Sequence, residues 1–384
     1  MSYTRREFGR LALAGLPAAA LIGRGESIFG AFAQAKPNSN FNGVQIGTIT
    51  YSYRAMPDQS AEATLKYILD SGISAIELMG GPVESYAGIP GSGRGDGPGG
   101  GGAGRGRGRG REGAADAPPP QFTSSWNGKP CNAQPRGDAP PTARGGGPGG
   151  GGRGRGEQTP EQRAAQEEQA AKVKAWRTSV SMDKFKALRK MYNDAGVSIY
   201  AWKQLSTNMS DEEYEYIFNV AEALGCTHTT LELPTGANAD AILKRLGDFA
   251  MKKKIYAAYH THLQGAMTAF DQAFAISKGN RANVDFGHWV AAGNVGGTPM
   301  DFLKKHHDRI SSFHLKDRTS PEHCALNLAW GTGETPIKDI LQLVQKNKWK
   351  FPGSVEMEYD VPEGSNPVAE VKKCVEYCRK VLTT

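Results

Sequence analysis

The chain lacks several features that would place it directly in a functional class. Its 384 residues contain only five cysteines, none spaced as C-x-x-C, which excludes the usual zinc and dithiol redox motifs. We interpret these cysteines as mostly structural, and the sequence does not fix a disulfide pairing. No G-x-G-x-x-G turn follows the first predicted strand, so the dinucleotide-binding fingerprint is absent.

Positive charge is concentrated in two segments of the chain. Residues 88–156 hold ten basic and four acidic residues, a net charge of +6, and the first 33 residues add +2. These segments account for the formal net charge of +7, and the remaining body is close to neutral. The body therefore has no basic footprint of the kind that binds nucleic acid, and we expect no nucleic-acid partner.

The first 33 residues are predicted to be a twin-arginine signal peptide. Arg5-Arg6 precedes an apolar run from Leu11 to Ile22, and Ala31-Phe32-Ala33 supplies the small residues that a signal peptidase reads. The apolar run is too short to span a bilayer comfortably, so we expect no stable membrane anchor. The predicted location is the periplasm or another exported compartment, reached through the twin-arginine machinery.

Strand-like and helix-like segments alternate from Val44 onward. Strands are predicted at Val44–Thr50, Ser74–Met79, Val197–Trp202, Thr227–Leu233, Ile255–His260, Ala282–Asp285, Ile310–Lys316 and Ser354–Tyr359. Helices are predicted near Ala61–Asp70, Glu161–Asp194, Asp211–Leu224, Ala239–Met251, Met267–Lys278, Met300–His307, Ile337–Lys346 and Pro367–Val381. Eight β/α units favour a closed α/β architecture, a (β/α)8 TIM barrel within residues 34–384, over a doubly wound open sheet.

Residues 88–156 interrupt the second unit. Gly, Arg and Pro dominate this segment, and its few apolar residues show no periodicity, which predicts a disordered insertion after the second strand. Its Arg-Gly repeats resemble RNA-binding tails, but in an exported protein a solvated tether or a surface-adhering loop is preferred. Phe122 and Trp126 leave open a contact with the barrel mouth.

Residues suited to metal and proton chemistry gather at the predicted carboxyl ends of the strands, where barrels of this class hold their active sites. They are Glu77, Trp202, Glu232, His260, His262, Asp285, His288, His314, Lys316, Glu356 and Glu358, from strands two to eight. Four of the eight histidines of the chain belong to this set. Mixed carboxylate and imidazole ligands suit one divalent metal ion, such as Mn²⁺, Mg²⁺, Co²⁺ or Zn²⁺.

These segments resemble the xylose-isomerase-like TIM-barrel superfamily, which includes the sugar phosphate isomerases and epimerases. The likeness lies in Leu231-Glu232-Leu233, Tyr259-His260-Thr261-His262, Val284-Asp285-Phe286-Gly287-His288, Phe313-His314-Leu315-Lys316-Asp317 and Ser354-Val355-Glu356-Met357-Glu358, with Gly331-Thr332-Gly333 before the seventh helix. No single motif is specific, but all five occur in the right order on the right strands. The match spans roughly Val44 to Val381 apart from the insertion.

The resemblance implies the roles of individual residues. The expected ligands of one divalent metal are Glu232, Asp285, His314 and Glu356. His288 and Lys316 are expected to hold substrate oxygens, and His260 to face the substrate. Because side chains on a strand repeat every second residue, Glu358 is an alternative to Glu356, which the aligned Ser-Val-Glu pattern favours.

In this family the glutamates on strands four and eight, here Glu232 and Glu356, are implied as the catalytic acid and base. A metal that bridges a carbonyl and its neighbouring hydroxyl stabilises an enediolate and eases removal of the α-proton. The leading prediction is an exported, metal-dependent isomerase or epimerase of a sugar or keto-sugar. A lyase or dehydratase that uses the same enolate on a 3-keto-glycoside or keto-inositol is the closest alternative.

Two further classes stay open as alternatives. An apurinic-site endonuclease of this barrel type uses additional histidines on strands two and three for a three-zinc cluster, where this chain has Glu77 and Trp202. A sugar-binding barrel without catalysis would leave its carbohydrate unchanged. The sequence also leaves the oligomeric state open.

Some strand-end features keep two interpretations. Glu77 is either a substrate-side acid or a cap of its own loop. Trp202 is either a stacking platform for a sugar ring or a packing residue. The Gly331-Thr332-Gly333 turn either holds a phosphate or, as we prefer, is only a tight turn. His228, low on the fourth strand, is interpreted as a core residue.

Overall fold

The structure, a computed structural model, describes residues 36–91, 125–127, 129–130 and 159–384. The predicted signal peptide, its cleavage after Ala33, and most of the predicted insertion, including Phe122 and Cys131, lie outside these residues. In the described part of the chain, no helix is both long and apolar enough to cross a membrane.

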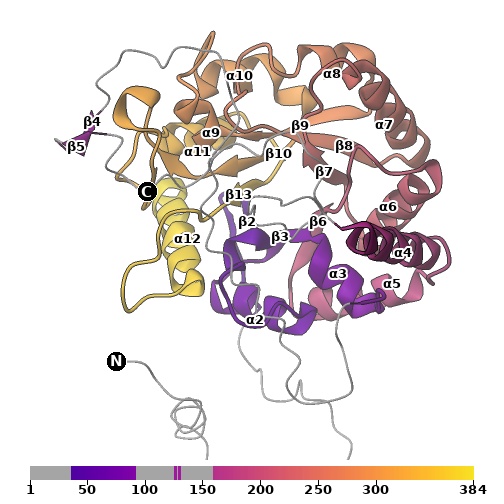
Figure 1. Ribbon diagram of the computed structural model, residues 1–384. Helices are drawn as coiled ribbons and strands as arrows, with labels where there is room; N and C mark the ends of the chain where they lie inside the picture. Colours follow the sequence, from indigo (N-terminus) through magenta and orange to yellow (C-terminus); the bar gives the residue numbers. More distant parts are fainter. Residues whose placement is uncertain (1–35, 92–124, 128, 131–158) are drawn as a thin grey trace, which may run out of the picture. The chain divides into compact units, whose positions relative to one another are not determined.

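Eight parallel strands close into a barrel, which confirms the predicted fold (Figure 1). They are β2 (Val44–Ile49), β3 (Ala75–Met79), β6 (Ser198–Lys203), β7 (His228–Glu232), β8 (Tyr256–His260), β9 (Asn280–Asp285), β10 (Ile310–Leu315) and β13 (Gly353–Val355). Each strand pairs with the next, β13 pairs with β2, and the Thr48–Ile76 pairing between β2 and β3 completes the ring. Closure leaves this set of strands without a free edge and brings all its carboxyl ends to one mouth.

Helices surround the ring of strands (Figure 1). They are α2 (Ala61–Asp70), α3 (Gly80–Ala87), α4 (Pro160–Arg177), α5 (Asp183–Asp194), α6 (Asp211–Leu224), α7 (Ala239–Lys253), α8 (Asp271–Ile276), α9 (Phe286–Ala291), α10 (Pro299–His306), α11 (Ile337–Lys346) and α12 (Pro367–Thr383). The short helices α3 and α9 directly follow β3 and β9 and were not predicted. Both begin at the mouth, where they fix the loops around the site.

Two predicted elements have the wrong extent. The single helix expected over residues 161–194 is two helices, and they differ in burial: α4 has no buried residue, whereas α5 buries Phe185, Leu188 and Tyr192. The last strand ends at Val355 instead of Tyr359. The Glu356 N–H still donates to the Leu315 carbonyl, but the next N–H turns to the Ser52 hydroxyl. The strand therefore stops beside Glu356.

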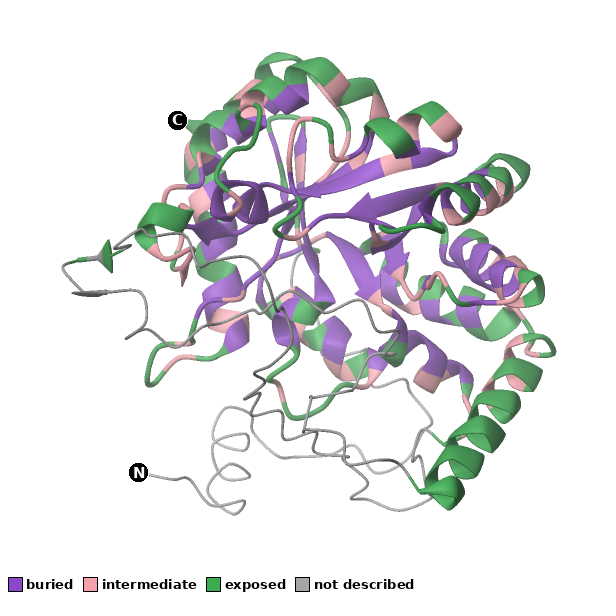
Figure 2. Cartoon of the chain, turned by 45° about the horizontal axis from the view of Figure 1, so that its top comes forward, coloured by how far each residue is buried: buried purple, intermediate pink, exposed green. Residues whose placement is uncertain are grey.

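The core lies between the strands and the inner faces of the helices (Figure 2). The strands are almost wholly buried, as expected for a parallel sheet covered by helices. Cys226, Cys374 and Cys378 are buried free thiols, in agreement with a structural role, whereas Cys324 is disulfide-bonded. His228 is fully buried, stacks on Tyr200 and contacts the Ser312 hydroxyl, so its interpretation as a core residue is confirmed.

Candidate metal centre at the barrel mouth

Four buried side chains from neighbouring strands meet at the carboxyl ends of the barrel. His260 and Asp285 end β8 and β9, His314 is the penultimate residue of β10, and Glu356 follows β13. One potential ligand atom from each lies within 4.8 Å of the other three. Adjacent parallel strands hold them in register, because His314 is paired with Asp285 on one side and with Ser354 on the other.

Asp285 serves two purposes with its two oxygens. Its Oδ1 accepts the backbone N–H of His288 at 2.7 Å and caps the N-terminus of α9. Its Oδ2 is buried among the other three side chains and accepts no hydrogen bond of good geometry. The cap fixes the carboxylate, so that its second oxygen faces the group.

His314 lies between two carboxylates. Its Nδ1 is 2.7 Å from Glu356 Oε2, and its Nε2 is 2.8 Å from Glu77 Oε2. Burial opposes the charged imidazole, but Glu77 and Glu356 outweigh it and raise the pKa of His314 to about 10. Because Nε2 is directed at Glu77, Nδ1 is the nitrogen on the side of the ligand group.

Lys316 places a positive charge within this group. Its Nζ is 3.2 Å from Asp285 Oδ2 and 3.1 Å from Glu356 Oε2, and it also pairs with Glu358. Burial would raise the pKa of Glu356, but Lys316 and His314 hold it well below its usual range. The Lys316 ammonium group therefore offsets part of the negative charge of these buried carboxylates.

The donor set fits a divalent ion. Two carboxylates and two imidazoles supply hard oxygen and borderline nitrogen ligands, which suit Mn²⁺, Co²⁺ or Zn²⁺. Asp285 Oδ2 and His260 Nδ1 are buried atoms without a hydrogen-bond partner, and buried polar groups normally have one. This group of His, Asp and Glu can therefore hold an ion.

Glu232 lies outside the group of four, although it was expected to be a ligand. Lys203 Nζ, at the end of β6, is 2.8 Å from its Oε1, and His262 Nδ1 is 3.1 Å from its Oε2. Burial opposes ionisation, but Lys203, His260 and His262 together outweigh it and hold the pKa of Glu232 well below its usual value. Its place in the group is taken by His260, which was expected to face the substrate.

Trp202 is a packing residue and does not form a stacking platform at the mouth. Its side chain is fully buried and packs edge-on against Tyr216 of α6, with ring centroids 6.3 Å apart. The pairing of β3 with β6 shifts by one residue between Ile199 and Ala201. Such a bulge reverses the faces of the residues that follow, so Trp202 turns to the helices while Lys203 reaches the mouth.

Glu77 is neither a cap of its own loop nor exposed to a substrate. It is fully buried, accepts a hydrogen bond from Thr230 Oγ1 at 2.6 Å, and contacts Asn283 Nδ2 at 3.2 Å. Its remaining contact is with His314 Nε2. Glu77 therefore orients a candidate metal ligand from below.

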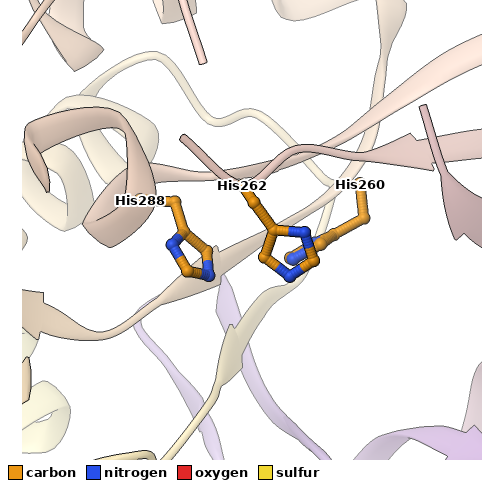
Figure 3. Close-up of side chains that lie close together, drawn as sticks. All are labelled: His260, His262 and His288. Carbon is orange, nitrogen blue, oxygen red and sulfur yellow. The ribbon is translucent and has the colours of Figure 1, made fainter. Parts of the chain in front are cut away.

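Three imidazoles form a second cluster that shares His260 with the first. Potential ligand atoms of His260, His262 and His288 lie within 4.8 Å of one another. Figure 3 shows the three rings side by side, with nitrogen atoms of each turned toward the others. His288 is also 3.0 Å from Lys316 through Nε2 and 2.6 Å from Arg318 through Nδ1.

The Gly331-Thr332-Gly333 turn is occupied by a side chain of the chain itself. All three backbone N–H groups donate to Asp317 Oδ2, at 2.8, 3.1 and 2.9 Å. The N–H of Thr335 donates to the other oxygen of the same carboxylate. The turn is therefore an anchored loop, in agreement with the preferred interpretation, and is not shaped for a phosphate.

Sequence reasoning missed Lys203, Asn283 and Arg318. Lys203 follows directly after the predicted end of its strand, and only the bulge brings it to the mouth. Asn283 is on the same strand as Asp285 and two residues before it, a spacing that places both on one face. Arg318 lies beyond the strand end, and no periodicity predicts that its guanidinium returns to His288.

No family model and no curated protein matches this chain. Solved structures do match. A sugar phosphate isomerase/epimerase from Parabacteroides distasonis ATCC 8503 is 14% identical, with a TM-score of 0.50 over 87% of this chain and 95% of that chain. The probable 3-DHS dehydratase AsbF from Bacillus anthracis is 13% identical, with a TM-score of 0.50 over 88% and 99%.

A xylose isomerase domain containing protein from Salmonella typhimurium LT2 is 10% identical, with a TM-score of 0.50 over 90% of this chain and 99% of that chain. Each neighbour is covered almost entirely by this chain. At such identities the likeness concerns the fold alone, so the chain shares the TIM-barrel fold of xylose isomerase-like proteins.

Proposed function

We propose that the protein is an exported, divalent-metal-dependent isomerase or epimerase of a sugar or keto-sugar. The observation that carries this proposal is the position of two glutamates relative to the four-residue ligand group. Glu356 belongs to the group, whereas Glu232 stands outside it at the end of β7. Around the barrel β7 and β13 are separated by three strands, so the two carboxylates reach the mouth from different sides.

His260, Asp285, His314 and Glu356 would hold the ion in this proposal. When bound, the ion supplies positive charge that stabilises oxyanions on a neighbouring carbonyl and hydroxyl. Lys316, which also pairs with Glu358, would donate from its ammonium group to a substrate oxygen. Glu232 is not needed as a ligand.

Glu232 is the proposed base. Lys203 keeps it ionised, and an ionised carboxylate can accept an α-proton that a neighbouring carbonyl has made acidic. The electron pair of the broken C–H bond moves into the enediolate. For an epimer, the opposite face of the same carbon receives a proton from solvent on the side of Glu356, and Glu232 releases its proton to solvent. For an isomer, Glu232 returns its proton to the adjacent carbon, and the hydroxyl proton passes to the former carbonyl oxygen.

A lyase or dehydratase is the second candidate. The likeness to the protein named as a probable 3-DHS dehydratase supports it, because elimination begins with the same removal of an α-proton. Incubation of candidate keto-sugars in deuterated water separates the two. Deuterium in an otherwise intact sugar supports isomerisation or epimerisation, whereas loss of water or an aglycone supports elimination.

The site itself is tested with two variants. We expect Glu232→Gln to retain one metal ion and to lose deuterium incorporation by a factor of about 10²–10⁴, the range for a general base. We expect His314→Ala to lose the ion. As a control, His307→Ala, on the exposed η4 turn (His307–Arg309), should change neither the metal content nor the deuterium incorporation. Loss of metal from Glu232→Gln would show that this carboxylate is a ligand after all.

The endonuclease alternative receives no support from the described mouth. Neither β3 nor β6 carries a histidine: β3 supplies Glu77, which is buried below the ligand group, and β6 supplies Lys203 at the mouth. Export remains part of the proposal on the strength of Arg5-Arg6 and the apolar run that follows. Changing both arginines to lysine is expected to leave the full-length precursor in the cytoplasmic fraction, and unchanged export would contradict it.

A further inference from the structure

The loop before α11 forms an anion cradle from the backbone N–H groups of Gly331, Thr332, Gly333 and Thr335. The first three donate to Asp317 Oδ2, and the Thr335 N–H donates to Oδ1 at 3.2 Å. Backbone N–H groups that converge in this way make a concave site for an oxyanion. In this chain the site is filled by a carboxylate of the chain itself, and Asp317 is only 2% exposed.

Two glycines allow the cradle to close around the carboxylate. Gly331 has a φ of +87°, in the left-handed region that glycine adopts without strain. A Cβ added at Gly333 would lie 2.3 Å from Asp317 Oδ1, so only glycine permits this approach. The loop is therefore built around an oxyanion that the chain supplies.

The cradle lies on one of the two loops that hold phosphate in many (β/α)8 barrels, those after the seventh and eighth strands. The loop after the seventh strand, β10, contains two cations, Lys316 and Arg318, and both are buried. Lys316 pairs with Asp285 and Glu356, and Arg318 donates to His288. Both cations of this loop are thus engaged within the barrel mouth.

The loop after the eighth strand, β13, is acidic. Residues 356–366 contain no lysine or arginine and four acidic residues: Glu356, Glu358, Asp360 and Glu363. Asp360 and Glu363 are exposed. Because a phosphate monoester carries about 1.5 to 2 negative charges at neutral pH, this loop repels it.

We propose that the substrate is a neutral sugar without a phosphate group, and that Asp317 enforces this specificity by occupying the anion cradle. The inference rests on the proposed function and narrows its substrate class. A neutral sugar needs hydrogen-bond partners for its oxygens but no compensating positive charge at these two loops. Asp317 acts by excluding a competing group and takes no part in the reaction.

Opening the cradle is the first test. In Asp317→Ala the four N–H groups lose their acceptor, so inorganic phosphate should take its place and stabilise the folded chain. Melting temperatures of the full chain are compared with and without phosphate, at constant ionic strength and equal metal content. In Asp317→Ala we expect a saturable rise of about 2 °C or more beyond any rise in the wild type.

Asp317→Asn is the matched control, because its amide keeps an oxygen in the cradle. We expect it to respond to phosphate as the wild type does. Phosphate bound elsewhere is common to all three proteins and cancels in the comparison. An equal response of the wild type and Asp317→Ala would overturn the filled cradle, and so would a response of Asp317→Asn as large as that of Asp317→Ala.

The second test uses the wild type and needs no variant to fold. Each candidate keto-sugar of the deuterium experiment is paired with its phosphate ester, for example D-fructose with D-fructose 6-phosphate. We expect solvent deuterium to enter the neutral sugar at least roughly 100-fold faster, because the ester would bring like charges together. Equal or faster exchange into the ester would overturn the proposal.

Failure of the proposed function gives a different result. If neither the sugars nor their esters exchange, the proposed reaction is wrong, and the neutral substrate is wrong with it. The phosphate response of Asp317→Ala is measured without a sugar. It therefore still shows whether Asp317 fills an anion cradle.

Discussion

The state of each ionisable residue at the mouth is set by the neighbours packed against it. His314 is held between Glu77 and Glu356, and Glu232 is held by Lys203. Two glutamates thus have different roles. Glu77 contacts the His314 imidazole below the ligand group, whereas Glu232 contacts the Lys203 ammonium beside it. The first orients a ligand, and the second remains available as a base.

Replacing Glu77 by Gln tests its orienting role. The amide keeps the size of the side chain but removes the charge that fixes the His314 ring, and loss of such partners typically weakens metal binding by about 10- to 100-fold. Competition with a chromophoric chelator measures the change. Thr230→Val, which removes only the hydroxyl donor to Glu77, is the control with a smaller expected effect; equal affinity in wild type and Glu77→Gln would contradict the role.

Replacing Lys203 by Met tests how Glu232 is kept ionised. Without the ammonium, the pKa of Glu232 rises from its lowered value, so the loss of activity on the acid side moves to a higher pH. The pH dependence of kcat/KM measures this shift. Lys252→Met, at an exposed pair with Glu215, should leave the profile unchanged, and an unshifted profile in Lys203→Met would argue against Glu232 as the base.

At the scale of secondary-structure elements, the short helices at the mouth position residues of the site. Helix α9 starts at the Asp285 cap and carries His288 in its first turn. It also passes close to the end of β10: a Cβ added at Gly287 would lie 2.6 Å from the Lys316 carbonyl oxygen. Glycine at this position allows the helix and the following strand to bring their side chains together.

Gly287→Ala is expected to force α9 away from Lys316. Overpacking of this kind typically costs about 1–3 kcal/mol of stability, and the shift should also weaken metal binding, because it moves the cap residue Asp285. Urea unfolding and chelator competition measure the two effects. Gly81→Ala, where an added Cβ meets open space within the early turns of α3, is the matched control; an unaffected Gly287→Ala would refute the close approach.

At the scale of the whole molecule, a closed barrel buries polar groups along its interior as well as at its mouth. His228 and Ser312 lie below the ligand group, 2.8 Å apart, and neither is exposed. Burial lowers the pKa of His228 to about 4. The barrel therefore folds around a neutral imidazole, and its stability depends on pH.

The sign of this dependence follows from proton binding. The unfolded chain protonates His228 below about pH 6.5, whereas the folded chain resists until about pH 4, so the contribution is complete above pH 6.5 and is lost as the pH falls. The loss between these values is roughly 3 kcal/mol. Between these two pH values the free energy of unfolding of His228→Gln, measured in urea, should fall less than that of the wild type. An equal fall in both proteins would contradict the burial of a neutral ring.

The sequence alone determined the barrel and the strand ends at which chemistry gathers. Apolar periodicity is local, and residues that end adjacent parallel strands must converge, so Asp285, His314 and Glu356 were predicted together. Only the tertiary structure decided which side chains pair. The bulge in β6 turned Trp202 outward and brought Lys203 to Glu232. These choices depend on contacts between residues distant in the chain and on one-residue shifts in register, which no local pattern records.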